Sequence, residues 1–180
     1  MLVILNAPNP TLSVKAKAVT KIDKGILKLI ELMKESLEAA VDPVGVGLAA
    51  PQVGRSLQIF IAKPTLKSKI FAFINPKIIK KIPTKKGEKE KESRKLEGCL
   101  SLQNIWGEVK RYNEILVSFQ DVTGKLHKKK FRGFMATIFQ HEIDHLNGVL
   151  FPKRVLEQKG TLYKSEKNKK GEDEFVELKI

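Results

Sequence analysis

The sequence predicts an α+β fold in which antiparallel sheets pack around a buried helix in the C-terminal half of the chain. Two segments carry apolar residues at helical spacing, and short segments of strand length lie between them. The chain has 180 residues, of which 42% are hydrophobic, and this is enough for one sizeable core. We therefore expect a single domain over residues 1–180.

The first helix is predicted over residues 23–40, because apolar side chains recur on one helical face at Ile26, Leu29, Ile30, Met33, Leu37 and Ala40. Strands are predicted after it at Leu57–Lys63, Ile70–Ile79, Ile115–Asp121 and Lys125–Phe131. The last two flank Val122-Thr123-Gly124, which is typical of a turn. His127 is expected to be a solvated residue of the last strand.

The second helix is predicted at about residues 133–147. Phe134, Ile138, His141 and His145 recur at helical spacing, and Asn147-Gly148 is a typical C-terminal stop. Apolar residues flank both histidines, so we expect this helix to be buried.

Two further segments are rich in lysine: a loop at about residues 80–95, within which Pro83 to Arg94 resembles an insertion, and a basic tail at about residues 156–180. In the tail, Thr161–Tyr163 and Phe175–Leu178 flank a charged turn at Lys167–Asp173, which predicts a terminal hairpin or strand rather than a terminal helix.

The cellular compartment is predicted from membrane spans, targeting peptides and cysteine content. No segment reaches the apolar length of a membrane span, and the apolar start Met1–Leu5 has no basic region before it, so we expect neither a signal nor a transit peptide. A single cysteine agrees with a reducing environment. We expect a cytoplasmic protein without membrane contact.

The segment His141-Glu142-Ile143-Asp144-His145 predicts a metal site. Positions i and i+4 share one face of a helix, so both imidazoles can converge on one cation beside a carboxylate. Two of the chain's three histidines lie in this segment. A buried histidine pair needs partners, and this favours the metal over two incidental surface histidines.

The third ligand has two candidate sources. A third histidine at the spacing of metzincin proteases is excluded, because that position is Phe151. A glutamate, Glu157 or Glu166, would complete a two-His, one-Glu peptidase site. The only cysteine, Cys99, would give a thiolate and two imidazoles with a fourth position left open, as in a catalytic site. Cys99 as a buried apolar residue is the alternative.

A third block, Gly45–Gly54, is dominated by small residues and carries one amide side chain, Gln52. It lacks the Gly-Lys-Ser/Thr ending of a phosphate loop. With this block the chain closely resembles the peptide deformylases, metalloenzymes that remove the formyl group from the N-terminal methionine of new bacterial and organellar polypeptides. Gly45–Gln52, Glu97–Ser101 and Gln140–His145 match, in order, the family blocks G-φ-G-φ-A-A-x-Q, E-G-C-L-S and Q-H-E-x-D-H. The resemblance extends over roughly residues 1–155.

The resemblance implies that Cys99, His141 and His145 bind one divalent metal ion. By family precedent this ion is Fe²⁺ in the cell, and Zn²⁺, Ni²⁺ or Co²⁺ can substitute. Glu142 would take a proton from the activated water and return it to the departing amine. The Gln52 amide and the backbone N–H of Leu100 would stabilise the charge that develops on the formyl oxygen.

The resemblance also places the methionine side chain of the substrate in an apolar pocket beside the metal. By matching positions, Val46, Ile138 and Leu100 line this pocket. Gly45 and Gly47 flank Val46, so the peptide backbone is expected to pair along this edge in the manner of a strand.

Trp106 is a departure from the commonest family pattern, because it stands about where many members carry an arginine that helps to bind the peptide. Two interpretations remain open. Trp106 either offers an apolar or stacking surface to the residues that follow methionine, or packs on the core.

The net charge of +14 at pH 7 would attract a polyanion, and the substrate of the resembled family emerges from the ribosome. Weak ribosome contact is therefore a hypothesis. No aromatic residues are interleaved with the lysines as in a base-stacking surface, so exposed, solvated segments are the favoured interpretation. We expect no sequence-specific binding of nucleic acid.

Two other functions remain as alternatives. A two-His, one-Glu zinc peptidase would share His141, Glu142 and His145 but would not need Cys99. A basic binding protein with a purely structural metal would not need Glu142.

Overall fold

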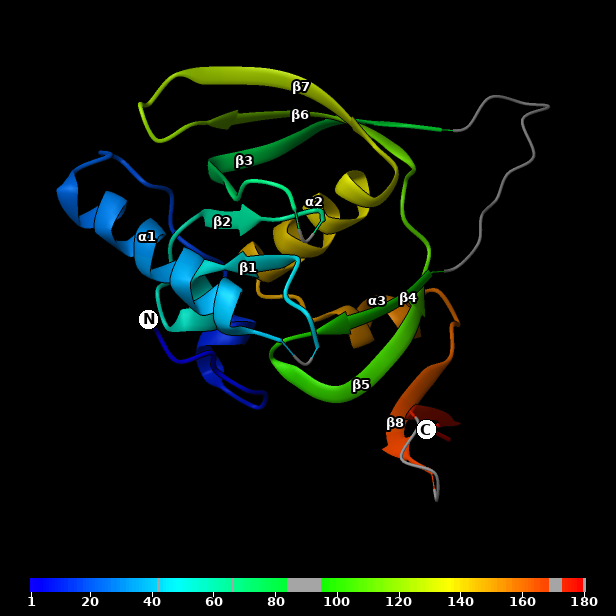
Figure 1. Cartoon of the computed structure of the whole chain (residues 1–180). Coiled ribbons are helices and arrows are strands. Elements are labelled where there is room, and N and C mark those ends of the chain that lie inside the picture. The colour runs from blue at the N-terminus through cyan, green and yellow to red at the C-terminus, as the bar shows by residue number, and fades with distance from the viewer. Residues whose placement is uncertain (42, 66, 84–94, 169–172, 180) are drawn as a thin grey trace.

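The computed structural model describes residues 1–41, 43–65, 67–83, 95–168 and 173–179, and it has the α+β architecture that the sequence predicts (Figure 1). The helices in these residues are η1 (Pro10–Ser13), α1 (Lys24–Ala39), η2 (Ala50–Val53), α2 (Gly133–Leu146) and α3 (Phe151–Glu157), with η marking a 3₁₀ helix. The strands are β1 (Gly47–Ala49), β2 (Ile59–Ala62), β3 (Phe71–Ile82), β4 (Lys95–Cys99), β5 (Leu102–Val109), β6 (Glu114–Gln120), β7 (Leu126–Arg132), β8 (Leu162–Lys167) and β9 (Asp173–Glu177).

The first sheet has the order β1-β2-β3-β6-β7 within the described residues, and each neighbouring pair is antiparallel. Its strands β2, β3, β6 and β7 are the four that alternation and β-branched residues predict. In β6 the inward positions are buried and the outward ones partly exposed, which is the period of two that fixes the register of a half-buried strand.

The second sheet has the order β4-β5-β8-β9, again antiparallel. The terminal hairpin is confirmed as β8 and β9, while four residues of the charged turn, 169–172, lie outside the described part of the chain. The insertion-like stretch at 84–94 lies outside it as well.

Helix α2 lies between the two sheets (Figure 1) and contacts β1, β2, β6, β7 and η2. It follows β7 without a loop, because Gly133 adopts a φ of +60° at the junction, a value that glycine reaches without steric cost. Phe139 is fully buried and packs edge-on against Phe60 and Phe73 of the first sheet, with ring centroids 4.9 and 5.4 Å apart. This core fixes the helix face that carries the histidines.

Helix α1 covers the other end of the core, next to β1 and β2. Asp23 caps its first turn by accepting a hydrogen bond from the backbone N–H of Ile26 at 3.0 Å. Ile30, Met33 and Leu37 are fully buried, as the helical spacing predicts. No helix in the described residues is long and apolar enough to cross a membrane.

Six elements of the described residues were not foreseen from the sequence: the strands β1, β4 and β5, the helix α3 and the 3₁₀ helices η1 and η2. The strands β1 and β4 are short and contain glycine, which weakens the strand signal. Helix α3 begins just before Pro152, and proline is tolerated in the first turn of a helix because no intrahelical N–H bond is needed there.

His127 is less solvated than expected from the sequence, since its ring stacks on Phe119 with 5.3 Å between ring centroids.

Candidate metal centre and active site

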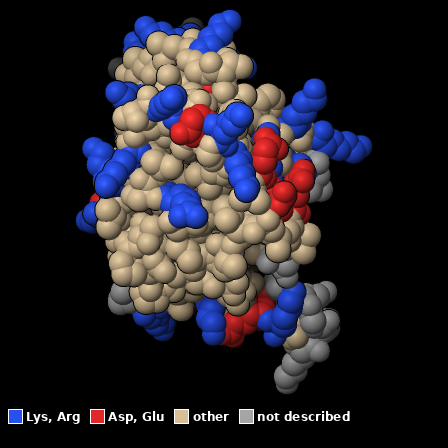
Figure 2. Space-filling view, turned by 90° about the vertical axis from the view of Figure 1, so that its left-hand side faces the viewer, with Lys and Arg blue, Asp and Glu red and all other residues tan. Residues whose placement is uncertain are grey.

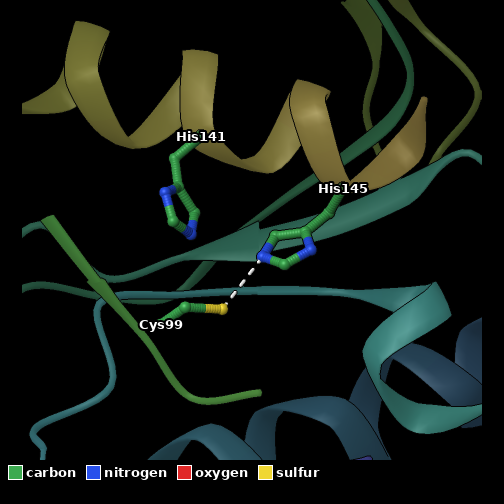
Figure 3. Close-up of side chains that lie close together, drawn as sticks. All are labelled: Cys99, His141 and His145. Atoms are coloured by element: carbon green, nitrogen blue, oxygen red, sulfur yellow. Dashed lines mark hydrogen bonds between the residues drawn. The ribbon is translucent and has the colours of Figure 1, made fainter. Parts of the chain in front are cut away.

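Cys99, His141 and His145 come together where the end of β4 meets α2 (Figure 3). Their possible ligand atoms, the cysteine sulfur and one nitrogen from each imidazole, all lie within 4.8 Å of one another. Cys99 Sγ lies 3.2 Å from His145 Nε2. The i, i+4 spacing places both imidazoles on one helix face, and the tertiary fold supplies the thiol from 42 residues earlier in the chain (141 − 99).

The electrostatics of the cluster favour a thiolate. Burial alone would raise the pKa of Cys99, but the charge of His145 and hydrogen bonds from both imidazoles outweigh burial and lower this pKa to about 5. Two further donors face the sulfur: the backbone N–H of Ser101 at 3.4 Å and the Gln52 amide nitrogen at 3.6 Å. The sulfur is therefore ready to act as an anionic ligand at neutral pH.

Glu97 orients His141 from the side away from the thiol. His141 Nδ1 lies 3.0 Å from Glu97 Oε2, and Arg111 donates to both oxygens of the same carboxylate at 2.8 and 2.9 Å. Burial would raise the pKa of Glu97, but the hydrogen bonds from Arg111 and His141 lower it to about 2. The carboxylate thus stays charged and fixes both the tautomer and the ring orientation of His141.

Asp144 continues this chain of contacts on the far side of α2. It accepts a 2.6 Å hydrogen bond from Arg111 Nη1 and a 2.7 Å hydrogen bond from Arg154 Nη2 of α3. Burial opposes ionisation of Asp144, yet the two guanidinium groups hold the pKa of its carboxyl below the usual value. Arg111 is consequently held between two carboxylates, Glu97 and Asp144, that lie close to the candidate metal ligands in the sequence.

Gln52 is held rigidly by the 3₁₀ helix η2. Its Oε1 accepts a 2.8 Å hydrogen bond from the backbone N–H of Ala49, and its Nε2 donates to Ser101 Oγ at 3.1 Å. The amide is 2% exposed, and its nitrogen therefore points at the cluster in a fixed orientation. This is the preorganisation expected of a donor that stabilises developing negative charge.

Glu142 is buried, and within the described residues its Oε2 has no hydrogen-bond partner. Burial raises the pKa of this carboxyl to about 7. A Cβ atom added at Gly47 would overlap the Glu142 carboxylate, so only glycine at this position of β1 leaves room for it. A buried polar atom without a partner is costly, so Glu142 is a candidate functional residue.

The predicted site residues surround one cleft of about 280 Å³. Its lining includes Gly45, Val46, Gly47, Gln52, Cys99, Leu100, Trp106, Ile138, His141 and Glu142. His145 lies just beneath, 1% exposed, with its Nε2 against the thiol. Trp106 is partly buried at the cleft and packs over Gly98. The structure therefore favours the cleft surface over the core for this residue.

Sequence reasoning missed Glu97, Ser101, Arg111 and Asp144 as parts of the site. Glu97, Ser101 and Asp144 lie inside the motif blocks, one or two residues from a candidate metal ligand, and this proximity was the available signal. No sequence pattern around Arg111 indicates its role, because only the folded chain brings this residue, which follows β5, to Glu97 and Asp144. The candidates Glu157 and Glu166 are not part of the metal cluster found in the described residues.

The donor set fits a divalent transition metal. One thiolate and two imidazoles suit borderline ions such as Fe²⁺ or Zn²⁺ better than Mg²⁺ or Ca²⁺, which prefer oxygen. The three donors belong to the protein and the cleft side is accessible, as in catalytic rather than structural sites. With the unpaired Glu142 carboxylate beside them, they define the class of metal-dependent hydrolases.

Comparison with known proteins narrows this class to one family. The polypeptide deformylase family model matches residues 1–160. A peptide deformylase of Desulfotalea psychrophila is 36% identical over 173 residues, which cover 94% of this chain and 96% of the relative. Peptide deformylase 1 of Bacillus cereus is 40% identical over 155 residues, which cover 86% of this chain and 92% of the relative. The chain belongs to the polypeptide deformylase family, whose metal-dependent members remove the N-formyl group from nascent polypeptides.

Solved structures agree with this assignment. The peptide deformylase of Thermotoga maritima superposes with a TM-score of 0.75 at 38% identity, covering 86% of this chain and 97% of that one. A Synechococcus elongatus peptide deformylase in complex with actinonin superposes with a TM-score of 0.76 at 34% identity, covering 86% of this chain and 78% of that one.

Proposed function

We propose that residues 1–180 act as a single catalytic domain that hydrolyses the formamide bond of formyl-methionyl nascent peptides and releases formate. One observation carries the assignment of residues: Glu142, whose buried Oε2 has no hydrogen-bond partner in the described residues, lines the same cleft as Cys99 and His141 of the Cys99, His141 and His145 cluster. An acid–base group beside a three-donor cluster suits metal-assisted amide hydrolysis.

Cys99, His141 and His145 would hold one divalent ion, Fe²⁺ in the cell, with Zn²⁺, Ni²⁺ or Co²⁺ able to replace it. When bound, such an ion polarises the formyl carbonyl and makes water acidic enough to supply hydroxide near neutral pH. Glu97 supports this role by fixing the orientation of the His141 ring.

Glu142 is the proton carrier of the proposed reaction. Its Oε2 takes a proton from the attacking water and gives it to the amine nitrogen as the bond between formyl carbon and nitrogen breaks. The Gln52 amide and the backbone N–H of Leu100 stabilise the negative charge on the formyl oxygen. Gln52 is suited to this task because Ala49 and Ser101 hold its side chain in place before any substrate arrives.

The methionine side chain would occupy the apolar part of the cleft, lined by Val46, Ile138 and Leu100. The peptide backbone would pair along Gly45–Gly47. In the described residues β1 is the first strand of its sheet, so its second edge carries no other strand and can accept one. This pairing favours formylated peptides over free formylmethionine.

The decisive experiment is anaerobic formate release from formyl-Met-Ala-Ser by protein loaded with Fe²⁺. Glu142→Gln keeps the size of the side chain and removes the base, so we expect a loss of at least about 100-fold in kcat with metal content unchanged. Glu38→Gln, on the exposed face of α1, is the matched control and should keep full activity. Formate release that survives in Glu142→Gln would remove Glu142 from the mechanism.

The Cys99→Ala variant distinguishes this site from that of a two-His, one-Glu peptidase. We expect it to lose bound Fe²⁺ and activity together, because one of three donors is gone. Retained metal and retained hydrolysis of unformylated peptides would favour the peptidase instead.

We also propose a cytoplasmic location, where nascent peptides and reducing conditions coincide, and at most weak, salt-dependent ribosome contact. Figure 2 shows Lys and Arg side chains dispersed over one face with acidic side chains among them, which supports solvation more than one continuous polyanion site. Pelleting with ribosomes at low and at physiological salt tests the contact. Absence of pelleting at both salt concentrations would exclude it.

A further inference from the structure

Trp106 forms one wall of the cleft next to the metal-ligand cluster. It stands opposite Gly98 in the pairing of β4 with β5, and its ring lies directly over that glycine. A Cβ atom at position 98 would approach the indole to 2.9 Å, so glycine is what lets the ring lie flat on the strand that ends in Cys99. The indole is thereby held at the wall of the cleft.

The terminal hairpin extends this wall. The family match ends at residue 160, and β8 and β9 follow it. Trp106 pairs with Tyr163 of β8, which pairs with Glu177 of β9. Since side chains alternate along a strand, Phe175 lies on the same face as Glu177 and therefore as Trp106. The rings of Trp106 and Phe175 meet edge to face, with 5.7 Å between centroids and 83° between planes.

Further exposed apolar side chains lie on the cleft or against the Trp106 ring. Phe175, which contacts that ring, is 44% exposed, and two residues that line the cleft, Leu96 and Phe134, are 40% and 49% exposed. Exposed apolar side chains are common singly, but Leu96 and Phe134 line the same cleft as Trp106. On the proposed function, a peptide that continues past methionine extends from its binding position by about 3.3 Å per residue, so its second or third residue can reach this apolar surface.

We propose that Trp106 and Phe175 form an aromatic wall that contacts the side chain of the second or third residue of the formyl peptide and favours an aromatic side chain there. The proposal rests on the proposed function and deepens it, because it names a specificity determinant in a hairpin beyond the family match. Within this aromatic wall, the pairing of β4 with β5 holds Trp106 in place, and Phe175 forms the outer edge of the wall.

The kinetic experiment compares formyl-Met-Phe-Ala-Ser and formyl-Met-Ala-Phe-Ser with formyl-Met-Ala-Ala-Ser on the Fe²⁺ protein. We expect kcat/KM to be about threefold to tenfold higher for one of the phenylalanine peptides, the range of an aromatic pair. Phe175→Ala should bring this ratio close to one. Val176→Ala is the matched control, since Val176 is similarly exposed, 46%, but lies on the opposite face of β9, and it should keep the ratio.

A binding experiment tests the aromatic wall independently of catalysis. Trp106 is the only tryptophan of the chain, so intrinsic fluorescence reports on it alone. The deformylated peptide Met-Ala-Phe-Ser or Met-Phe-Ala-Ser should shift the emission to shorter wavelength in wild type and in Val176→Ala, and the shift should be reduced in Phe175→Ala. Thermal melts confirm that both variants fold.

The outcomes separate the two proposals. An emission shift without formate release would support the wall and overturn the proposed function. Formate release with equal kcat/KM for all three peptides, or a preference that Phe175→Ala and Val176→Ala lower equally, would overturn the wall and leave the function standing. Neither formate release nor an emission shift would overturn both.

Discussion

The carboxylate of Glu97 contacts the imidazole of His141, with 3.0 Å between Glu97 Oε2 and His141 Nδ1. The same carboxylate is held on both oxygens by Arg111. Glu97, two residues before the proposed metal ligand Cys99, therefore orients a second proposed ligand, His141, which lies 44 residues after Glu97 in the chain (141 − 97).

Glu97→Gln should weaken metal binding by about 10-fold to 100-fold, because the ring of His141 loses its charged partner. Competition with a chelator, followed by metal analysis, measures this affinity. Glu114→Gln is the control, since Glu114 is also paired with an arginine, Arg132, but is only partly buried and lies away from the cleft. Equal metal affinity in the two variants would contradict the orienting role.

Gly47→Ala should lower kcat by more than about 10-fold while the metal stays bound. A methyl group at position 47 overlaps the Glu142 carboxylate and must displace it, and small misplacements of a proton carrier are costly. Gly25→Ala in the first turn of α1 is the control and should keep kcat. Unchanged kcat in Gly47→Ala would show that the fit between β1 and Glu142 is not needed.

Asp144→Asn should destabilise the fold by about 3 kcal/mol, because it breaks the buried ion pair with Arg111 and the partly exposed one with Arg154, and leaves the buried guanidinium of Arg111 short of a partner. Urea unfolding measures the change. Glu157→Gln removes another partner of Arg154, but that carboxylate is 45% exposed, so its loss should cost less than about 1 kcal/mol. Similar costs for the two variants would mean that burial does not strengthen the network.

Asp121→Asn should lower the melting temperature at pH 7 by an amount that shrinks at acid pH. Hydrogen bonds from Thr123 and from His127 hold the pKa of the Asp121 carboxyl below its usual value. Its contribution is therefore fully present above the unfolded pKa of about 3.9 and is lost as the pH falls through the folded value. Melting curves from pH 7 down to pH 3 test this. A difference that does not change with pH would assign the effect to turn geometry alone.

Much of the site was predictable because its chemistry is encoded in short spacings. His141 and His145 share a helix face whatever surrounds them, and the apolar flanks of Phe139 and Leu146 show that this helix is buried. The strands β6 and β7 were equally clear from alternation and from the turn between them. The strands β4 and β5 have a weak sequence signal, because they are held by their pairing with each other and by contacts with α3 rather than by the strand preference of their residues.

The sequence by itself determined the helix that carries two proposed metal ligands, the lone thiol, the family resemblance and the mixed fold, since each depends on local spacing or residue type. Tertiary structure decided that Arg111 lies between Glu97 and Asp144, that Gly47 makes room for Glu142, and that Phe175 meets Trp106. These contacts join residues between 14 and 95 positions apart in the chain (111 − 97, 142 − 47). No local pattern encodes such contacts, because only the packing of the two sheets around α2 brings these residues together.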